Sequence, residues 1–172
     1  YYAIPIGCMD KEDALNDEEI VKLAKKIAEY KNELNETKVF VGDNLGYHSK
    51  YNLQDDWKGC QAGLGICAID SEGNVKGCPI HPNELIEGNI RDKTFSEIWK
   101  NKDSFSYNRK PQKLDAHCKK CKYNHTCRAG CKSSMYSQGI KDFKHNDMCL
   151  YHIENHIKHK NNQKSWKKTL ER

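Results

Sequence analysis

The spacing of apolar residues predicts a helix between two short strands in the first quarter of the chain. Apolar side chains recur every three or four positions over residues 20–34, which indicates an amphipathic helix. Asn16 or Asp17 can cap this helix, and Glu19, three residues after Asn16, would complete a capping box. The flanking segments YYAIPI (1–6) and KVFV (38–41) are rich in strand-forming residues. Strand, helix and strand at this spacing predict a βαβ unit with parallel strands.

A single βαβ unit cannot bury both faces of a parallel sheet. Residues 1–48 are therefore expected to be the end of something larger, and the chain to be a C-terminal piece of a longer protein. The stretch that follows contains turn-forming residues without periodicity. We predict a linker at residues 49–56.

A hairpin and a short helix are predicted further along. Two short runs of residues flank the turn at 71–74, where Gly73 suits a positive φ. Thr94 and Glu97 form a second capping box, which predicts a helix in the segment TFSEIWKN. A further helix is expected from Cys127 to a C-cap at Gly139. It would place Cys127, Cys131 and Met135 on one face.

Composition indicates that apolar burial alone does not hold this protein together. Hydrophobic residues make up 37% of the chain and charged residues 31%, so the core must be thin for 172 residues. The chain contains nine cysteines, and no run of apolar residues is long enough to cross a membrane. Its first residues lack the basic and apolar regions of a secretion signal. We therefore expect a reducing, cytoplasmic compartment and no membrane partner.

The positive charge is concentrated at the end of the chain. The net charge is +5, and residues 150–172, with six Lys or Arg and two Glu, contribute +4 of it. A nucleic-acid partner would depend on this segment alone and is not expected. Residues 153–172 are predicted to be a basic tail that is helical or disordered.

The cysteines are the main chemical signal. Four of them fall within HCKKCKYNHTCRAGC (117–131), three flank the hairpin, and Cys149 follows, so eight form two sets of four. Two iron–sulfur clusters would use all eight, and one or two structural zinc ions would use four or eight. Disulfides would leave one cysteine odd and require an oxidising compartment. Spacing alone leaves iron–sulfur clusters and zinc open and disfavours disulfides.

The order Cys60-x12-Gly73-x4-Cys78, Cys118-x2-Cys121-x5-Cys127-x3-Cys131 and then Cys149 resembles the seven-cysteine signature of the SPASM domain. This domain is the C-terminal extension of many radical S-adenosylmethionine (SAM) enzymes that mature peptides and proteins. The resemblance covers residues 57–152. The upstream βαβ pattern resembles, more weakly, the last strands of the partial (β/α)6 barrel of those enzymes. The implied fold is α+β: a small SPASM domain, stabilised by its iron–sulfur clusters and built from a β-hairpin, short helices and loops, after a barrel remnant at 1–48.

The resemblance implies two [4Fe–4S] clusters with separate ligand sets. The first set is Cys60, Cys67, Cys78 and Cys131, where Cys67 lies outside the seven-cysteine signature. The second set is Cys118, Cys121, Cys127 and Cys149. With every iron ligated by protein, the first cluster would have no open iron for substrate. Cys8 stands apart and is expected to be a small buried side chain.

One element of the family is missing from this chain. Radical SAM enzymes need a C-x3-C-x2-C motif for their third [4Fe–4S] cluster and S-adenosylmethionine, and no such triplet is present. The chain alone is therefore expected to be inactive. The implied partners are an upstream radical SAM barrel, a peptide or protein substrate, and an electron donor such as a flavodoxin or ferredoxin. The implied role is electron transfer or substrate positioning by the auxiliary clusters. The alternatives are a stand-alone iron–sulfur carrier and a zinc-stabilised binding module with a basic tail.

Overall fold

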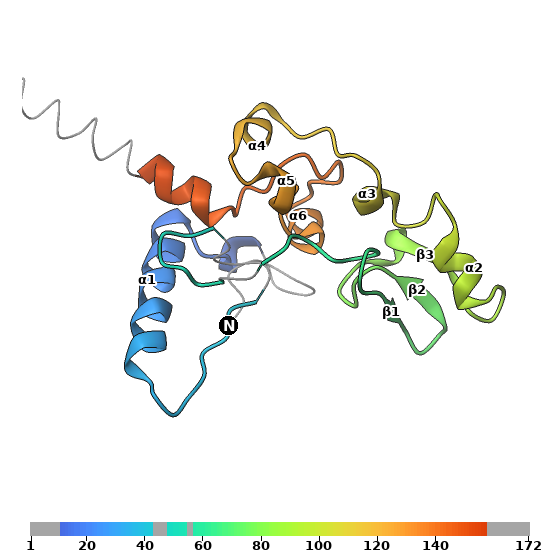
Figure 1. Cartoon of the computed structure of the whole chain (residues 1–172), viewed down its shortest axis with the longest axis horizontal. Helices are drawn as coiled ribbons and strands as arrows, with labels where there is room; N and C mark the ends of the chain where they lie inside the picture. Colours follow the sequence, from blue (N-terminus) through green and yellow to red (C-terminus); the bar gives the residue numbers. More distant parts are fainter. Residues whose placement is uncertain (1–10, 43–47, 55–56, 158–172) are drawn as a thin grey trace, which may run out of the picture. The chain divides into compact units, whose positions relative to one another are not determined.

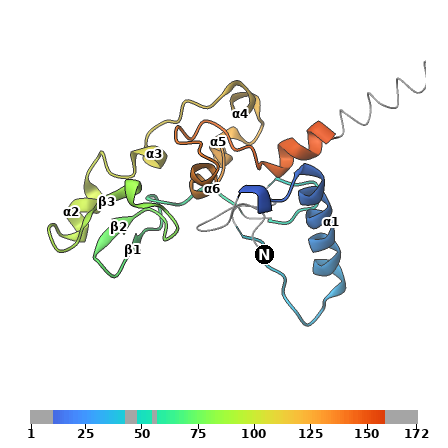
Figure 2. The ribbon, with the colours of Figure 1, turned by 180° about the vertical axis from the view of Figure 1, so that it is seen from behind.

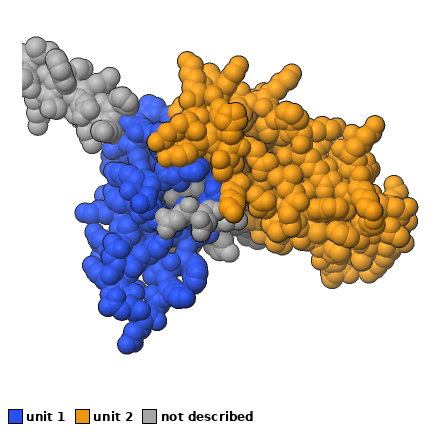
Figure 3. Space-filling view, viewed as in Figure 1, with its two compact units in different colours: residues 1–5, 9–57, 148–172 blue, residues 6–8, 58–147 orange. Residues whose placement is uncertain are grey.

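The computed structural model describes residues 11–42, 48–54 and 57–157. The chain divides into two compact units, shown in different colours in Figure 3. Unit 1 consists of residues 1–5, 9–57 and 148–172, and unit 2 of residues 6–8 and 58–147. Within the described ranges, no helix has both the length and the apolar content needed to cross a bilayer.

Unit 1 is built on one long helix, α1 (Asp17–Glu33), which follows the 3-10 turn η1 (Lys11–Asp13) (Figure 1). The predicted capping box is confirmed. The Asn16 side chain accepts from the backbone N–H of Glu19 at 3.1 Å, and the Asn16 N–H donates to the Glu19 carboxylate at 2.9 Å. These bonds satisfy two of the donors that a helix start leaves unpaired, so α1 begins where the sequence predicts.

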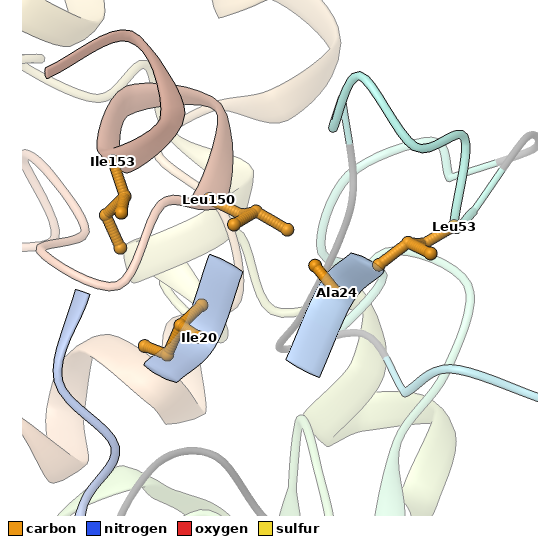
Figure 4. Packing of buried hydrophobic residues seen from close by; sticks show 5 residues of the cluster. All are labelled: Ile20, Ala24, Leu53, Leu150 and Ile153. Atoms are coloured by element: carbon orange, nitrogen blue, oxygen red, sulfur yellow. The ribbon is translucent and has the colours of Figure 1, made fainter. Parts of the chain in front are cut away.

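The core of unit 1 joins three segments that are distant in sequence. Ile20 and Ala24 of α1, Leu53, and the helical stretch 150–157 supply its fully buried side chains, with Leu150 and Ile153 from the last of these. Figure 4 shows these five side chains packed together. Hydrogen bonds reinforce the same arrangement. Both Ser49 Oγ (2.7 Å) and the Lys50 N–H (3.0 Å) donate to the Glu154 carboxylate.

The predicted βαβ unit is not confirmed. The structure assigns no strand to residues 38–41, and the other predicted strand, 1–6, lies outside the described residues. Phe40 is 85% exposed. A strand needs a neighbour to pair its backbone groups, whereas here the carbonyls of Val41 and Gly42 accept from Gln54 Nε2 at 2.7 and 2.6 Å. The prediction of a strand at 38–41 is therefore wrong.

Unit 2 contains a three-stranded antiparallel sheet in the order β1-β2-β3. The strands are β1 (Ala68–Ile69), β2 (Asn74–Lys76) and β3 (Ile86–Asn89), and the 3-10 turn η2 (Asn83–Leu85) precedes β3. The predicted hairpin is confirmed, with Gly73 at φ +88. Asp70 closes its turn by accepting from the backbone N–H groups of Glu72 and Asn74, both at 3.0 Å.

Helix α2 (Phe95–Lys100) contacts β3, and the two elements lie side by side in both ribbon views (Figures 1 and 2). The second predicted capping box is also confirmed, since Thr94 and Glu97 exchange backbone and side-chain hydrogen bonds. Ile98 packs with Val75 and Phe105 in a small buried core. This core connects the sheet to α3 (Ser106–Arg109), the element that leads toward the cysteine-rich segment.

The cysteine-rich segment forms three short helices: α4 (Ala116–Lys120), α5 (Asn124–Cys127) and α6 (Lys132–Ser137). The predicted continuous helix from Cys127 to Gly139 is wrong. Arg128, Ala129 and Gly130 all have positive φ (50°, 66° and 90°), a conformation that a right-handed helix cannot contain. This break gives Cys127 and Cys131 independent orientations instead of one shared helical face.

The predicted C-cap at Gly139 is present. Gly139 has φ +83 and its N–H donates to the Tyr136 carbonyl, while the Ile140 N–H donates to the Met135 carbonyl at 3.0 Å. This pair of bonds is a Schellman motif, which favours glycine because of its positive φ. The small sheet and short helices are the α+β fold expected for this region, whereas the barrel remnant is not confirmed. The division at 48, 56 and 152 stays a prediction.

Candidate metal centre

The eight cysteines predicted as metal ligands all lie among the described residues. Each is a half-buried thiol, and the structure joins none of the eight in a disulfide. Cys8 lies outside the described residues. Seven of the eight belong to unit 2, and Cys149 belongs to unit 1. The surroundings of the seven cysteines in unit 2 are therefore described together below.

Cys60 is held against the turn that follows α5. Gly59 has φ +84, and a Cβ at this position would run into the Thr126 carbonyl oxygen. The Cys60 carbonyl accepts from Arg128 Nη2 at 2.8 Å and from Asn108 Nδ2 at 2.9 Å. Two side chains from distant segments therefore fix the backbone of Cys60 beside the turn that separates Cys127 from Cys131.

The loop after Cys60 is fastened to α3 by an arginine. Arg109 Nε donates to the Gly63 carbonyl at 2.6 Å, and Arg109 Nη1 donates to the Trp99 carbonyl at 2.7 Å. Its guanidinium lies 4.6 Å from the Trp99 ring centroid and 4.5 Å from that of Phe105. Because the arginine satisfies loop carbonyls while stacking on the aromatic core, the loop from Cys60 to Cys67 is tied to the rest of unit 2.

Cys78 follows β2 and lies in a segment packed against Tyr107. A Cβ at Gly77 would run into the Tyr107 hydroxyl. The His81 N–H donates to the Cys78 carbonyl at 3.0 Å. The His81 ring lies 5.3 Å from the Tyr107 ring, with Nδ1 3.3 Å from the Tyr107 hydroxyl.

Burial shifts the pKa values of His81 and Tyr107. His81 is only 2% exposed, and burial lowers its pKa to about 4, with Lys76 adding to the effect. Burial also raises the pKa of the Tyr107 hydroxyl, and negative charge on Glu87, Cys60 and Cys78 raises it further. Both side chains are therefore neutral near pH 7, and they bond to each other next to the Cys78 segment without adding charge there.

Cys131 is the thiol of the first predicted set whose pKa departs most clearly from its ordinary value. Burial raises the pKa of its thiol to about 11, and negative charge on Cys60 and Cys78 contributes to the rise. Backbone hydrogen bonds from Ser134 and Ser133, at the start of α6, act in the opposite direction by favouring the thiolate. Cys60 and Cys78 thus both lie within electrostatic range of the Cys131 thiol.

The other predicted set begins in two consecutive turns. Asp115 caps α4, and its carboxylate accepts from the Cys118 N–H at 2.7 Å. The Cys121 N–H donates to the Cys118 carbonyl at 3.2 Å, and the Cys127 N–H donates to the Tyr123 carbonyl at 2.8 Å. This local bonding places the C-x2-C pair in one turn, the arrangement that lets two thiolates reach one metal or one edge of a cluster. The place of Cys149 beside these three stays a prediction.

The donor set fits an iron–sulfur centre by its chemistry. It consists of thiols in a dry region, with backbone N–H donors on Cys131 and the cations Arg128 and Lys132 beside them. Among the described residues, however, no three Cys, His, Asp or Glu side chains already close around a point where a metal ion would lie. Thiolates repel one another, and metal binding supplies the free energy that draws them together.

Four residues around Cys60 and Cys131 were not identified from the sequence. Asn108 and Tyr107 are distant from every cysteine in sequence, and no local pattern marks them. Arg128 and Lys132 each directly follow a cysteine, so a basic residue next to a thiol was the available signal. Burial of Lys132 lowers its pKa to about 8, while Cys60, Cys127 and Cys131 act to raise it.

Comparison with known families identifies the central part of the chain. Residues 60–122 match the family model of the SPASM domain, described as an iron–sulfur cluster-binding domain. The matched residues contain five of the eight predicted ligands. No solved structure matches the chain.

Several characterised proteins are similar to this chain over a limited length. An AdoMet-dependent heme synthase of Methanosarcina barkeri is 36% identical over 94 residues, which cover 55% of this chain and 26% of that protein. A mycofactocin maturase of Mycobacterium ulcerans is 36% identical over 83 residues, or 47% of this chain and 22% of that protein. A cysteine-type anaerobic sulfatase-maturating enzyme of Clostridium perfringens is 28% identical over 87 residues, or 50% and 24%. The matches span about a quarter of the length of these relatives. The resemblance predicted from the cysteine spacing is confirmed: residues 60–122 belong to the SPASM family of iron–sulfur cluster-binding domains.

Proposed function

We propose that this chain is the auxiliary-cluster region of a radical SAM enzyme that modifies a peptide or protein. The SPASM match supports the iron–sulfur part of this proposal. The relatives support the rest, since one is named for its dependence on AdoMet and two are named as maturases. The chain has no C-x3-C-x2-C motif, so the radical chemistry would come from an upstream barrel.

The proposed centre is a pair of [4Fe–4S] clusters. Cys60, Cys67, Cys78 and Cys131 would hold the first, and Cys118, Cys121, Cys127 and Cys149 the second. The observation that carries the proposal is a set of contacts that hold distant thiol segments: Arg128 Nη2, in the turn before Cys131, donates to the Cys60 carbonyl, and Gly77, next to Cys78, packs against the Tyr107 hydroxyl. Cys127 and Cys131 would serve different clusters, and the break at 128–130 supports this by turning them independently.

The proposed role is to move electrons. A [4Fe–4S] cluster supplies one-electron redox chemistry when bound. With four thiolates on each cluster no iron is open for substrate, so we propose relay of an electron rather than direct ligation of the peptide. Burial of Cys131 and the neutral Tyr107 and His81 would limit the access of water to the first cluster. An electron donor such as a flavodoxin or ferredoxin, in the cytoplasm, would complete the system.

The metal content of protein purified without oxygen tests the proposal. About eight irons and eight sulfides per chain, with broad absorption near ~400 nm, are expected for two [4Fe–4S] clusters. Zinc without sulfide would overturn the proposal in favour of a zinc-stabilised binding module. Full iron in a natural protein that has no upstream barrel would instead favour a stand-alone electron carrier.

Single cysteine variants test the two ligand sets. Cys60→Ser and Cys127→Ser should each lose about four irons while retaining the other cluster. Retention of all iron in both variants would contradict the assignment. Cys8→Ser is the matched control, because it removes a thiol that belongs to neither proposed set.

A further inference from the structure

Lys132 is a buried ammonium group that directly follows the proposed ligand Cys131. It is 0% exposed, the same as the core residues Ile20 and Met135. Lysine is rarely buried without a partner, because transfer of an ammonium ion out of water is costly. Its complete burial therefore calls for a compensating negative charge.

The contacts of Lys132 do not supply that charge. Its Nζ donates to the Arg128 carbonyl at 2.7 Å and lies 5.8 Å from the centroid of the Phe143 ring. Both partners are formally neutral. Over residues 11–42, 48–54 and 57–157, no carboxylate lies within ion-pair distance of Lys132. Arg128 adds a second cation to the same turn, which increases the excess of positive charge.

The negative charge available at this place is thiolate. Cys131 immediately precedes Lys132. Arg128, whose carbonyl accepts from Lys132 Nζ, also donates from its Nη2 to the Cys60 carbonyl at 2.8 Å. Cys60, Cys127 and Cys131 all act electrostatically on the ammonium group. Two of these three thiols belong to the first proposed cluster, and one belongs to the second.

We propose that Lys132 is the buried counter-charge of the iron–sulfur centre and sets its reduction potential. This inference rests on the proposed function. A [4Fe–4S] core with four thiolates is an anion, and it becomes more negative by one charge when it takes one electron from the donor. No bond forms or breaks, and the ammonium keeps its proton. Because a fixed positive charge stabilises the reduced form more than the oxidised one, Lys132 raises the potential, with the larger effect on the first cluster.

Three variants separate the charge of Lys132 from its hydrogen bond. Lys132→Gln keeps a donor for the Arg128 carbonyl but removes the charge, and Lys132→Arg keeps the charge. Lys120→Gln removes the same charge from an exposed side chain beside Cys121, where water screens it. The full chain, loaded with iron and sulfide, is titrated with a reductant in the absence of oxygen. Absorption and electron paramagnetic resonance monitor the reduction of each cluster.

The expected result is a shift of the first cluster to a more negative potential in Lys132→Gln. Lys132→Arg should stay close to the wild type, and Lys120→Gln should not differ from it. An unchanged potential in iron-replete Lys132→Gln overturns the inference. If Lys132→Gln loses iron, a normal iron content in Lys132→Arg supports the inference of a counter-charge. Loss of iron in both variants overturns that inference. A wild-type protein without iron and sulfide would refute the proposed function itself, which is a distinguishable result.

Discussion

The two units of this protein are stabilised by different means. Unit 1 has one long helix and a core that joins α1 to residues 48–54 and 150–157 through fully buried aliphatic side chains. Over residues 58–147, unit 2 has two small cores of three buried residues each, and much of this range lies in turns and short helices. Its interior also buries His81, Asn108 and Lys132. Unit 1 resembles an ordinary hydrophobic fold, whereas unit 2 buries polar groups that apolar packing does not stabilise.

The backbone also differs between the units: among the described residues of unit 1, His48 and Asn52 are isolated non-glycine residues with positive φ, whereas unit 2 has a run of them. Three consecutive residues of unit 2, 128–130, have positive φ, and two of them are not glycine. Such residues are strained and persist only where the surroundings hold them. In unit 2 the holding contacts are Arg128 to Cys60 and Lys132 to Arg128, both beside proposed metal ligands. We therefore expect unit 2, which contains seven of the eight proposed ligands, to depend on the proposed metal centre more than unit 1 does.

The largest expected effect comes from removal of the metal. Chelation should lower the protection of amides in residues 58–147 against hydrogen exchange by about a hundredfold or more, because metal binding supplies folding free energy there. Helix α1 should stay protected by its own core. Hydrogen–deuterium exchange with peptide-level mass spectrometry of loaded, chelated and mock-treated protein measures this. Equal loss of protection in α1 and in unit 2 would remove the distinction between the units.

Two glycines of unit 2 provide a matched pair of variants that differ in packing but not in φ. Gly59 and Gly139 have almost the same φ, +84 and +83, but a Cβ at Gly59 would run into Thr126, whereas a Cβ at Gly139 would meet nothing within 4 Å. Gly139→Ala should cost about 1 kcal/mol of unfolding free energy for backbone strain alone. Gly59→Ala should cost about 3 kcal/mol or more and reduce iron content, because it displaces Cys60. Anaerobic urea denaturation and iron assays give both quantities, and similar losses for the two variants would contradict the assigned packing.

A core substitution tests unit 1 separately. Ile20 is 0% exposed in the core of unit 1, so Ile20→Ala should lower the unfolding free energy of that unit by about 3 kcal/mol. The neighbouring Val21, which is partly buried, provides a milder control as Val21→Ala. The hydrogen-exchange rates of the amides in α1 measure this loss of unfolding free energy. The iron content should stay at the wild-type level, and a fall to half in Ile20→Ala would show that the metal centre depends on this core.

The smallest predicted effect is a pH dependence confined to unit 2. Burial lowers the pKa of His81 to about 4 from its ordinary 6.5, so the folded state keeps the imidazole neutral where the unfolded state binds a proton. The part of the unfolding free energy that depends on a neutral His81 is therefore complete above pH 6.5 and is lost as the pH falls toward 4. Between pH 7.5 and 5.5 it should amount to about 1 kcal/mol. The difference between the urea midpoints at pH 7.5 and pH 5.5 should be larger in the wild type than in His81→Gln. An equal difference in the two proteins would contradict the prediction.

Much of the local structure could be predicted from the sequence, because its causes lie within a few residues. The two capping boxes, at Asn16 and Thr94, need only a side chain and a backbone group three positions apart. The turn at Gly73 and the C-cap at Gly139 need a residue that tolerates positive φ. The cysteine spacing likewise identified the SPASM domain before any contact was known.

The errors arose where the outcome depended on distant partners. Residues 38–41 have strand-forming side chains, but a strand also requires a neighbour, and the side chain of Gln54 takes their carbonyls instead. The segment 127–139 has helical spacing, but Arg128 turns out of the helix and reaches the Cys60 carbonyl. No periodicity within a segment reports a bond to a residue 68 positions away.

The local elements, the candidate thiol ligands and the family of residues 60–122 could thus be predicted from the sequence alone. The contacts around these thiols became visible only in the folded structure. The fold fixed the Cys60 carbonyl at the turn before Cys131, packed the Cys78 segment on Tyr107 and buried Lys132 next to Cys131. The reason is physical: capping and turn formation act along the chain, whereas burial and electrostatic pairing act through space.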